Sequence, residues 1–328
     1  MKRRWLAALA ASAAVMAAGG VTAQQRTRAL SQSAVAQAAQ QHPQVVEEFG
    51  GELGGPLGDY VRGVGARVAT QTAVAGGGEA FRVTTLNSPV MNAFAVPGGY
   101  VYVTRQMLGL MNDEAELAFV LGHEKGHVAA RHGQERQRAS VLSQLGALLV
   151  GVVSGSGQLG QVAGQLGQGF VLSYSRRQEL ESDDLGIRYL HGAGYDPAAS
   201  TSLLAALGQW TALEARFQGR EDDQRATPAW ARTHPLSEDR VRRASAQVRA
   251  LARPAQNERA RDRFLAAIDG MIFDDDPAQG VVEGREFRHP QLRLAFTAPP
   301  GFGIQNGTRA VTLSGTGGQA QFSTAAFD

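Results

Sequence analysis

Cysteine is absent from the 328-residue chain, and lysine occurs only at positions 2 and 125. Without cysteine, the protein can form no disulfide bond and can carry no lipid on a cysteine side chain. Apolar residues make up 43% of the sequence, which is ordinary for a globular protein and sufficient for a sizeable core. The core, rather than covalent cross-links, is therefore expected to stabilise the fold.

A long apolar run is also missing at the N-terminus. Residues 2–4 are Lys, Arg and Arg, residues 5–18 are mostly apolar, and residues 21–23 are Val, Thr and Ala. A membrane-spanning helix needs about 20 apolar residues, so this run is too short for a membrane anchor. Basic residues, a short apolar run and small residues in this order are typical of a secretory signal peptide. We expect cleavage after Ala23 and a periplasmic location.

Excess charge of one sign is lacking as well. The formal net charge is only +2. The three basic residues at positions 2–4 belong to the segment that is expected to be removed. No basic surface of the kind that binds phosphates remains, so nucleic acid is excluded as a partner.

Charged side chains are missing from residue 139 to residue 175. Residues 141–153 are apolar but interrupted by Gly146 and Gly151, and residues 158–168 place glutamines on one helical face and apolar residues on another. Three interpretations remain open for this stretch: a buried helical hairpin, a segment that contacts a membrane surface, and a mobile lid over a site formed elsewhere.

The clearest motif that is present is His123-Glu124-Lys125-Gly126-His127, which has the form H-E-x-x-H. Residues four apart share one face of an α-helix, so His123 and His127 can bind the same atom. Neutral imidazole is a good zinc ligand, and Glu124 can reach a metal-bound water. The preceding residues suit a helix start, with Asn112 as the expected cap and acidic residues in the first turn. The motif predicts a site for one zinc ion per chain.

His132 is not expected to be the third ligand. The longer pattern H-E-x-x-H-x-x-G-x-x-H would need Gly at 130 and His at 133, where this chain has Ala130 and Gly133. Five residues along a helix correspond to a rotation of about 140° away from the ligand face. The third ligand must therefore come from another part of the chain.

A charged cluster at residues 175–184 offers the missing ligand. Glu179 and Asp183 are four apart and share a helical face, so one carboxylate can bind the metal and the other can accept from a ligand imidazole. Glu181 is rotated by about 200° from Glu179 and is expected to face elsewhere. Taken alone, the cluster would be interpreted as a solvated helix face, and His234 as an ordinary loop histidine. A role of the cluster in metal binding is favoured only because the first motif needs another ligand.

The remaining patterns predict a mixed α+β chain. Short β-like runs at 81–86, 90–96 and 100–104 predict a small antiparallel sheet directly before the metal-binding helix. An exposed edge of such a sheet would suit binding of an extended peptide by strand addition. Helices are expected near 57–68, 197–213, 237–251 and 259–268, and a strand at 287–296.

Several motifs in this order resemble one family. The chain is similar to the zinc metallopeptidases of the HtpX and CAAX prenyl protease family (gluzincin type), and most of all to soluble BepA-like members of the bacterial envelope. The resemblance covers about residues 45–250 and rests on His123-Glu124-x-x-His127, Glu179-x-x-x-Asp183 after Ser175-Arg176, His234-Pro235 with Arg240, Asn92-Ala93-Phe94-Ala95-x-Pro97-Gly98-Gly99, and Arg131-His132. Two departures are Lys125, where such enzymes often carry an apolar residue, and Ser182, where Ala is common.

The resemblance implies an α+β fold with a mainly helical zincin-type metallopeptidase domain and a small antiparallel sheet. The change in composition after residue 254 and the short β-like runs there predict a small β-rich C-terminal region. The expected domains are a signal peptide at 1–23, the metallopeptidase domain at 24–253, and a helix plus β-rich region at 254–328 that a longer natural protein would continue. If the uncharged stretch is a surface segment rather than a buried hairpin or a lid, residues 141–170 would contact a membrane surface or an outer-membrane assembly partner.

The resemblance also implies roles for individual residues. Zinc would be held by His123, His127 and Glu179, with Glu124 as the general base. Asp183 and Arg240 would lie behind the ligands, and the strand formed by Asn92, Ala93, Phe94, Ala95 and Val96 would bind a protein or peptide substrate. His234 would lie close to the metal, where it could stabilise an oxyanion or plug the open coordination position.

The expected function is that of a zinc-dependent endopeptidase acting on misfolded or mislocalised cell-envelope proteins. Two alternatives stay open. One is a chaperone-like protein with a structural zinc ion, and the other is a latent peptidase that His234 keeps shut.

Overall fold

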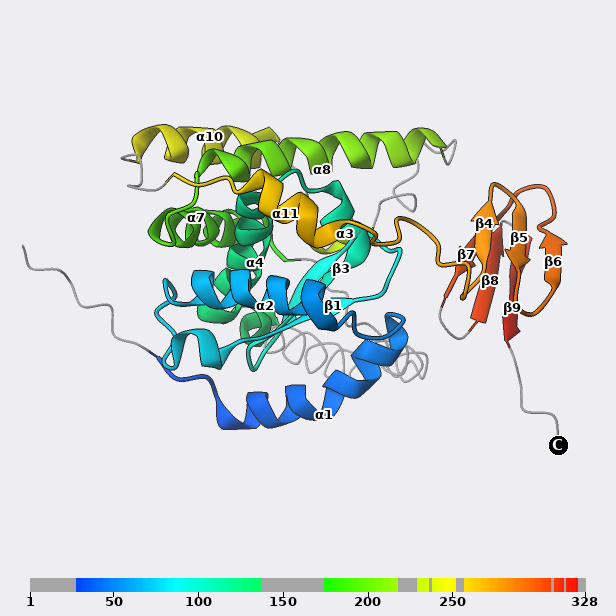
Figure 1. Ribbon diagram of the computed structural model, residues 1–328, viewed down its shortest axis with the longest axis horizontal. Helices are drawn as coiled ribbons and strands as arrows, with labels where there is room; N and C mark the ends of the chain where they lie inside the picture. Colours follow the sequence, from blue (N-terminus) through cyan, green and yellow to red (C-terminus); the bar gives the residue numbers. More distant parts are fainter. Residues whose placement is uncertain are drawn as a thin grey trace, which may run out of the picture.

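The computed structural model describes residues 28–136, 174–217, 229–235, 238–251, 257–307, 310–315 and 317–323. The expected signal peptide at 1–23 and the stretch 141–170 lie outside this part of the chain. The elements of the larger, mainly helical part are α1 (Gln32–Glu48), α2 (Gly55–Ala69), a 3₁₀ turn (Gly77–Ala80), β1 (Arg82–Leu86), β2 (Ala93–Val96), β3 (Tyr100–Thr104), α3 (Arg105–Leu110), α4 (Glu114–Ala129), α7 (Arg176–Gly192), α8 (Ala198–Phe217), α9 (Ala229–Thr233), α10 (Glu238–Ala250) and α11 (Arg261–Ile268) (Figure 1). Together with the strands of the C-terminal region, they confirm the predicted α+β class.

The first sheet has the strand order β1-β3-β2. β2 and β3 are antiparallel, as predicted, but β1 and β3 are parallel, so the predicted small antiparallel sheet contains one parallel pair. The chain passes from β1 to the edge strand β2 and returns as β3 between them. The return turn contains Gly98 and Gly99 at φ 104° and 88°, a conformation that favours glycine. This order leaves β2 at one edge of the sheet.

Helix α4 lies at the centre of the larger part, between the sheet on one side and α7 and α8 on the other (Figure 1). All its residues from Glu114 to Val128 are buried. The helix is capped by Asp113, whose side chain accepts from the backbone N–H of Glu116 at 3.0 Å. Asn112, the predicted cap, instead donates its backbone N–H to the Glu116 carboxylate at 2.7 Å. The predicted acidic first turn is confirmed.

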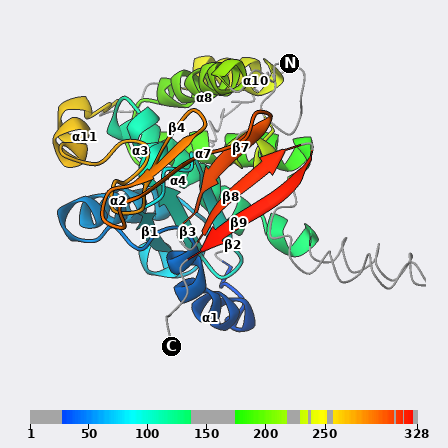
Figure 2. The same ribbon diagram turned by 90° about the vertical axis from the view of Figure 1, so that its right-hand side faces the viewer.

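The C-terminal region consists of two three-stranded antiparallel sheets, and Figure 2 shows the one formed by β7, β8 and β9 facing the viewer. The predicted single strand at 287–296 is instead a hairpin, because Arg293 at φ 51° turns the chain. The strands are β4 (Val281–Glu283), β5 (Glu286–His289), β6 (Leu294–Thr297), β7 (Phe302–Asn306), β8 (Ala310–Gly315) and β9 (Gly318–Ser323).

Helix α11 follows the domain boundary predicted at residue 254. Its Phe264 is fully buried in the same core cluster as Leu117 and Leu121 of α4. The boundary itself stays a prediction, but this contact shows that α11 packs with the helical part. Within the residues described, no helix is both long and apolar enough to cross a membrane.

Candidate metal centre

Helices α4 and α7 approach closely because small residues line both sides of their contact. A Cβ atom on Gly186 would lie 3.1 Å from the backbone nitrogen of His123, and one on Gly126 would lie 2.8 Å from Oγ of Ser182. Ser182 donates its hydroxyl to the carbonyl of His123 at 2.6 Å. The serine at this departure from the family pattern therefore joins the two helices. This close approach brings the side chains of α7 within reach of the H-E-x-x-H motif.

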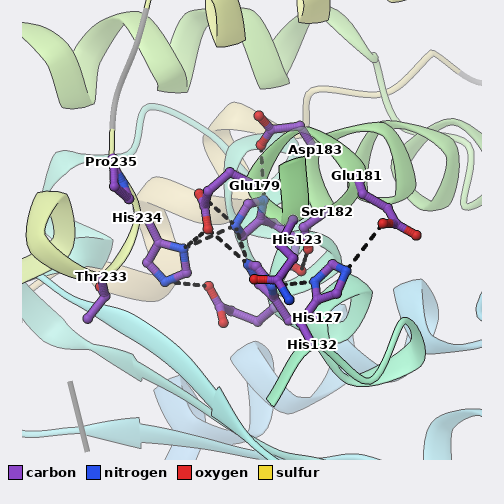
Figure 3. A network of polar contacts seen from close by, with 12 residues as sticks. His123, His127, His132, Glu179, Glu181, Ser182, Asp183, Thr233, His234 and Pro235 are labelled. Atoms are coloured by element: carbon purple, nitrogen blue, oxygen red, sulfur yellow. Dashed lines mark hydrogen bonds and ion pairs between the residues drawn. The ribbon is translucent and has the colours of Figure 1, made fainter. Parts of the chain in front are cut away.

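Four buried groups meet between α4, α7 and the end of α9: His123, His127, Glu179 and His234 (Figure 3). One ligand atom from each lies within 4.8 Å of the other three. The two α4 histidines and Glu179 are the residues predicted as metal ligands, and His234 is the residue predicted to lie beside them. The structure brings all four together.

The spacing of the donor atoms matches the demands of zinc. In a tetrahedral site with bonds of about 2.0–2.1 Å, neighbouring ligand atoms lie about 3.3–3.4 Å apart. Nε2 of His127 is 3.0 Å from Nε2 of His123 and 3.3 Å from Oε1 of Glu179, and Oε2 of Glu179 is 3.7 Å from Nε2 of His123. Nδ1 of His234 is 3.3 Å from Nε2 of His123 and 3.0 Å from Oε1 of Glu179. The imidazole and carboxylate donors therefore suit a small divalent cation in both chemistry and size.

Asp183 and Arg240 lie behind the ligand cluster. Asp183 is 3.0 Å from Nδ1 of His123 and accepts two hydrogen bonds of 2.7 Å from Arg240. Arg240 also lies 2.8 Å from Oε2 of Glu179. Burial alone would raise the pKa of Asp183, but the Arg240 guanidinium lowers the pKa to about 2. A carboxylate that stays ionised can hold the N–H of a ligand imidazole in place.

The charges of the cluster favour a cation between these side chains. Burial alone would lower the pKa of His123, but its contact with Asp183 and the negative charge of Glu179 raise that pKa. Burial lowers the pKa of His127 well below the usual value, so this ring is neutral, which is the form that binds a metal. The site thus combines negative charge around His123 with a neutral nitrogen donor at His127.

Glu124 and His234 face each other across the cluster. Nε2 of His234 lies 3.5 Å from Oε1 of Glu124. Both oxygens of Glu124 are buried, and neither accepts a hydrogen bond from the described residues. The His234 ring stacks on Trp230, with ring centroids 4.3 Å apart. A general base must lie within reach of the proton that it abstracts, and a carboxylate beside a cluster of candidate metal ligands meets this condition.

The predicted substrate strand lies beside the same helix. β2 contacts α4, and the side chains of Asn92, Ala93, Ala95 and Val96 are buried, while Phe94 is half-buried. A pocket connects the end of β2 with His127. It is lined by Leu30, Ser31, Ala34, Ala95, Val96, Pro97, Gly98, His127, Val128, Arg131, Gly133, Gln134 and Tyr174.

Two residues that contact His127, a candidate ligand, were not identified from the sequence. Nδ1 of His132 lies 2.9 Å from Nδ1 of His127, and the Tyr174 ring stacks on the His127 ring with centroids 3.6 Å apart. The cluster of four candidate ligands among the described residues does not include His132, whose exclusion as a ligand stays a prediction. Glu181 faces away from the ligands, as expected, and contacts His132 (Figure 3). In the sequence, the only indication of the contact between His132 and His127 was the Arg131-His132 pair of the family resemblance.

Comparison with known proteins agrees with this geometry. Residues 58–248 match the model of peptidase family M48. The chain is 33% identical over 159 residues to the mitochondrial metalloendopeptidase OMA1 of Schizosaccharomyces pombe, covering 48% of this chain and 44% of that protein. It is 32% identical over 197 residues to the beta-barrel assembly-enhancing protease of Escherichia coli, covering 57% of this chain and 38% of that protein. The matches thus span less than half the length of these relatives. Because the family model covers more than half of the chain, the protein belongs to peptidase family M48.

Proposed function

We propose that this protein is a zinc-dependent endopeptidase in which His123, His127 and Glu179 hold the metal. The observation that carries this proposal is the meeting of these three buried donors beside Glu124, whose carboxylate accepts no hydrogen bond from the described residues. Zinc bound there would act as a Lewis acid on the peptide carbonyl and would acidify a water molecule. The protein's own contribution is to hold the donors and to place Glu124 next to them.

Glu124 would act as the general base. Its side chain is fully buried, so no bulk water competes for the carboxylate. It would remove a proton from the attacking water and would then deliver this proton to the leaving amine. In a chaperone-like protein with a structural metal, a buried carboxylate at this place would have no use, and the peptidase is therefore the function that the geometry supports better.

The substrate would be an extended peptide that lies along β2. It would pair with the outer edge of the strand formed by Asn92, Ala93, Phe94, Ala95 and Val96. Among the described residues β2 is an edge strand, and an edge strand offers backbone groups for pairing. The pocket between the end of β2 and His127 would accept one of its side chains. This position would place a peptide bond beside the proposed metal ligands.

His234 would have one of two roles at the fourth position. It would stabilise the negative charge that develops on the carbonyl oxygen, or it would occupy the position itself and keep the enzyme latent. The distances of 3.0 and 3.3 Å from Nδ1 of His234 to Glu179 and His123 favour the latent state for the conformation seen here. If His234 is a plug, His234→Ala raises cleavage of casein several-fold; if His234 aids catalysis, the same change lowers it.

The substrates would be misfolded or mislocalised envelope proteins in the periplasm. The sequence of residues 1–23 supports export, and similarity to the beta-barrel assembly-enhancing protease of Escherichia coli supports a role in the cell envelope. Residues 141–170 would provide contact with a membrane surface or an outer-membrane assembly partner. A test of export is the mature N-terminus, which is expected at Gln24 after expression in a bacterial host.

The enzymatic proposal is tested by a casein cleavage assay on zinc-loaded wild type and Glu124→Gln. We expect the variant to retain zinc and to lose cleavage by at least about 100-fold, since general-base catalysis contributes about 10²- to 10⁴-fold. Unchanged cleavage would remove Glu124 from the mechanism. A chaperone-like protein would instead keep its function in cells when it carries Glu124→Gln.

A further inference from the structure

We propose that His132 is a positioning residue for His127, and that Glu181 in turn orients His132. The proposal rests on the function proposed above, in which His127 holds zinc through Nε2. It adds a series of polar contacts that runs from the surface carboxylate of Glu181 through the buried ring of His132 to His127.

The turn after α4 brings His132 back to the helix. α4 ends at Ala129, and Arg131 adopts φ 61°, in the left-handed region. A further helical turn then begins at His132. The rotation of about 140° that a continuous helix would impose does not apply, because the helix has ended before residue 132. His132 is instead 1% exposed and lies against His127.

The contacts assign the proton on each ring. With zinc held by Nε2 of His127, as proposed above, the proton of this ring lies on Nδ1. Nδ1 of His127 can then donate to Nδ1 of His132 at 2.9 Å, which requires that His132 carries its own proton on Nε2. That N–H points to Oε2 of Glu181 at 3.4 Å. One consistent set of donors and acceptors therefore runs from Glu181 to the nitrogen that faces the metal site.

The two α4 histidines thus have different partners. His123 has the ionised carboxylate of Asp183 at its Nδ1, whereas His127 has the neutral ring of His132. The Tyr174 ring stacks on the His127 ring and also limits its orientation. Polar partners of metal-bound histidines fix the ring orientation, and their loss typically weakens metal binding by about 10- to 100-fold.

The experiment compares zinc affinity in His132→Leu and His132→Asn, by competition with a chelator of known affinity. Leu removes the acceptor and keeps much of the volume, while Asn places its Oδ1 near the position of Nδ1. We expect the dissociation constant for zinc to rise about 10- to 100-fold in His132→Leu and to return to within about fivefold of wild type in His132→Asn. The thermal midpoints of the two metal-free variants should be similar, so that the difference lies in metal binding.

An affinity of His132→Leu within threefold of wild type would overturn the role of His132, as would equally weak binding in both variants. If His132→Leu does not fold, the variant Glu181→Ala tests the proposal instead, because Glu181 is the exposed residue of the contact series. It should weaken zinc binding about threefold, because its contact is long, while Asp184→Ala, on the same helix but paired with Arg243, should not. Equal affinities in these two variants would overturn the proposal. Absence of zinc from the wild type would overturn the proposed function as well.

Discussion

Lys125 is a buried cation whose ammonium group has no hydrogen-bond partner among the described residues. Its side chain is fully inaccessible, and Nζ lies 5.4 Å from the centroid of the Phe81 ring. A buried charge without a partner is costly. We therefore expect Lys125→Met, which keeps the length of the side chain and removes the charge, to stabilise the protein.

The magnitude follows from the pKa of the ammonium group. Burial lowers the pKa of Lys125 from 10.5 to about 7, and this difference corresponds to about 5 kcal/mol at most. The unfolded chain binds more protons than the folded protein between pH 7 and pH 10.5, so wild-type stability rises with pH in this window. The penalty is full below pH 7, falls by about 2 kcal/mol between pH 7 and pH 9, and vanishes above pH 10.5.

The assay is urea unfolding of wild type and Lys125→Met at pH 7 and pH 9, with equal zinc content. At pH 7 the variant should be more stable by about 2–5 kcal/mol, and at pH 9 this advantage should be smaller by about 2 kcal/mol. Since all other titrating groups are shared, the change in the difference between the two proteins reports on Lys125. An equal free energy of unfolding at pH 7, or a difference that does not change with pH, would refute the reasoning.

Two further substitutions test the packing around α4. Gly186→Ala should destabilise the protein by about 1–3 kcal/mol in urea unfolding, because its Cβ would lie 3.1 Å from the nitrogen of His123. The matched change Gly63→Ala on α2, where no atom lies within 4 Å, should stabilise it by about 0.5–1 kcal/mol; equal effects would contradict the close approach of the helices. Phe264→Ala should cost about 3–5 kcal/mol, because this α11 side chain is fully buried in the core, and a cost below about 1 kcal/mol would show that α11 is not part of it.

The positions of the proposed metal ligands on α4 and α7 were predictable because they depend on helical periodicity. His123 and His127, and likewise Glu179 and Asp183, are four residues apart, and the 3.6-residue repeat places each pair on one face. These spacings did not predict that the two helical faces, one on α4 and one on α7, lie against each other. The joint site was inferred from resemblance to a family, because His234 is 55 residues from Glu179 and no local pattern connects them.

Features that depend on single backbone angles or on distant contacts escaped prediction. The position of His132 depends on the left-handed conformation of Arg131, which a non-glycine residue rarely adopts. The parallel pairing of β1 with β3 depends on which strand occupies the middle of the sheet, and alternation of side chains does not specify this order. The burial of Lys125 contradicts the usual preference of lysine for the surface, so the residue type alone would have predicted an exposed side chain.

The most direct test of the proposed metal site is the zinc content of purified wild type, Glu179→Ala and Asp184→Ala, measured by mass spectrometry after dialysis. Asp184 lies on the same helix and pairs with Arg243, away from the ligand cluster, so its loss controls for changes in α7. We predict one zinc ion per chain in wild type and in Asp184→Ala, and a large loss of zinc in Glu179→Ala. Full zinc content in Glu179→Ala, or none in wild type, would contradict the assignment of His123, His127 and Glu179 as the ligands.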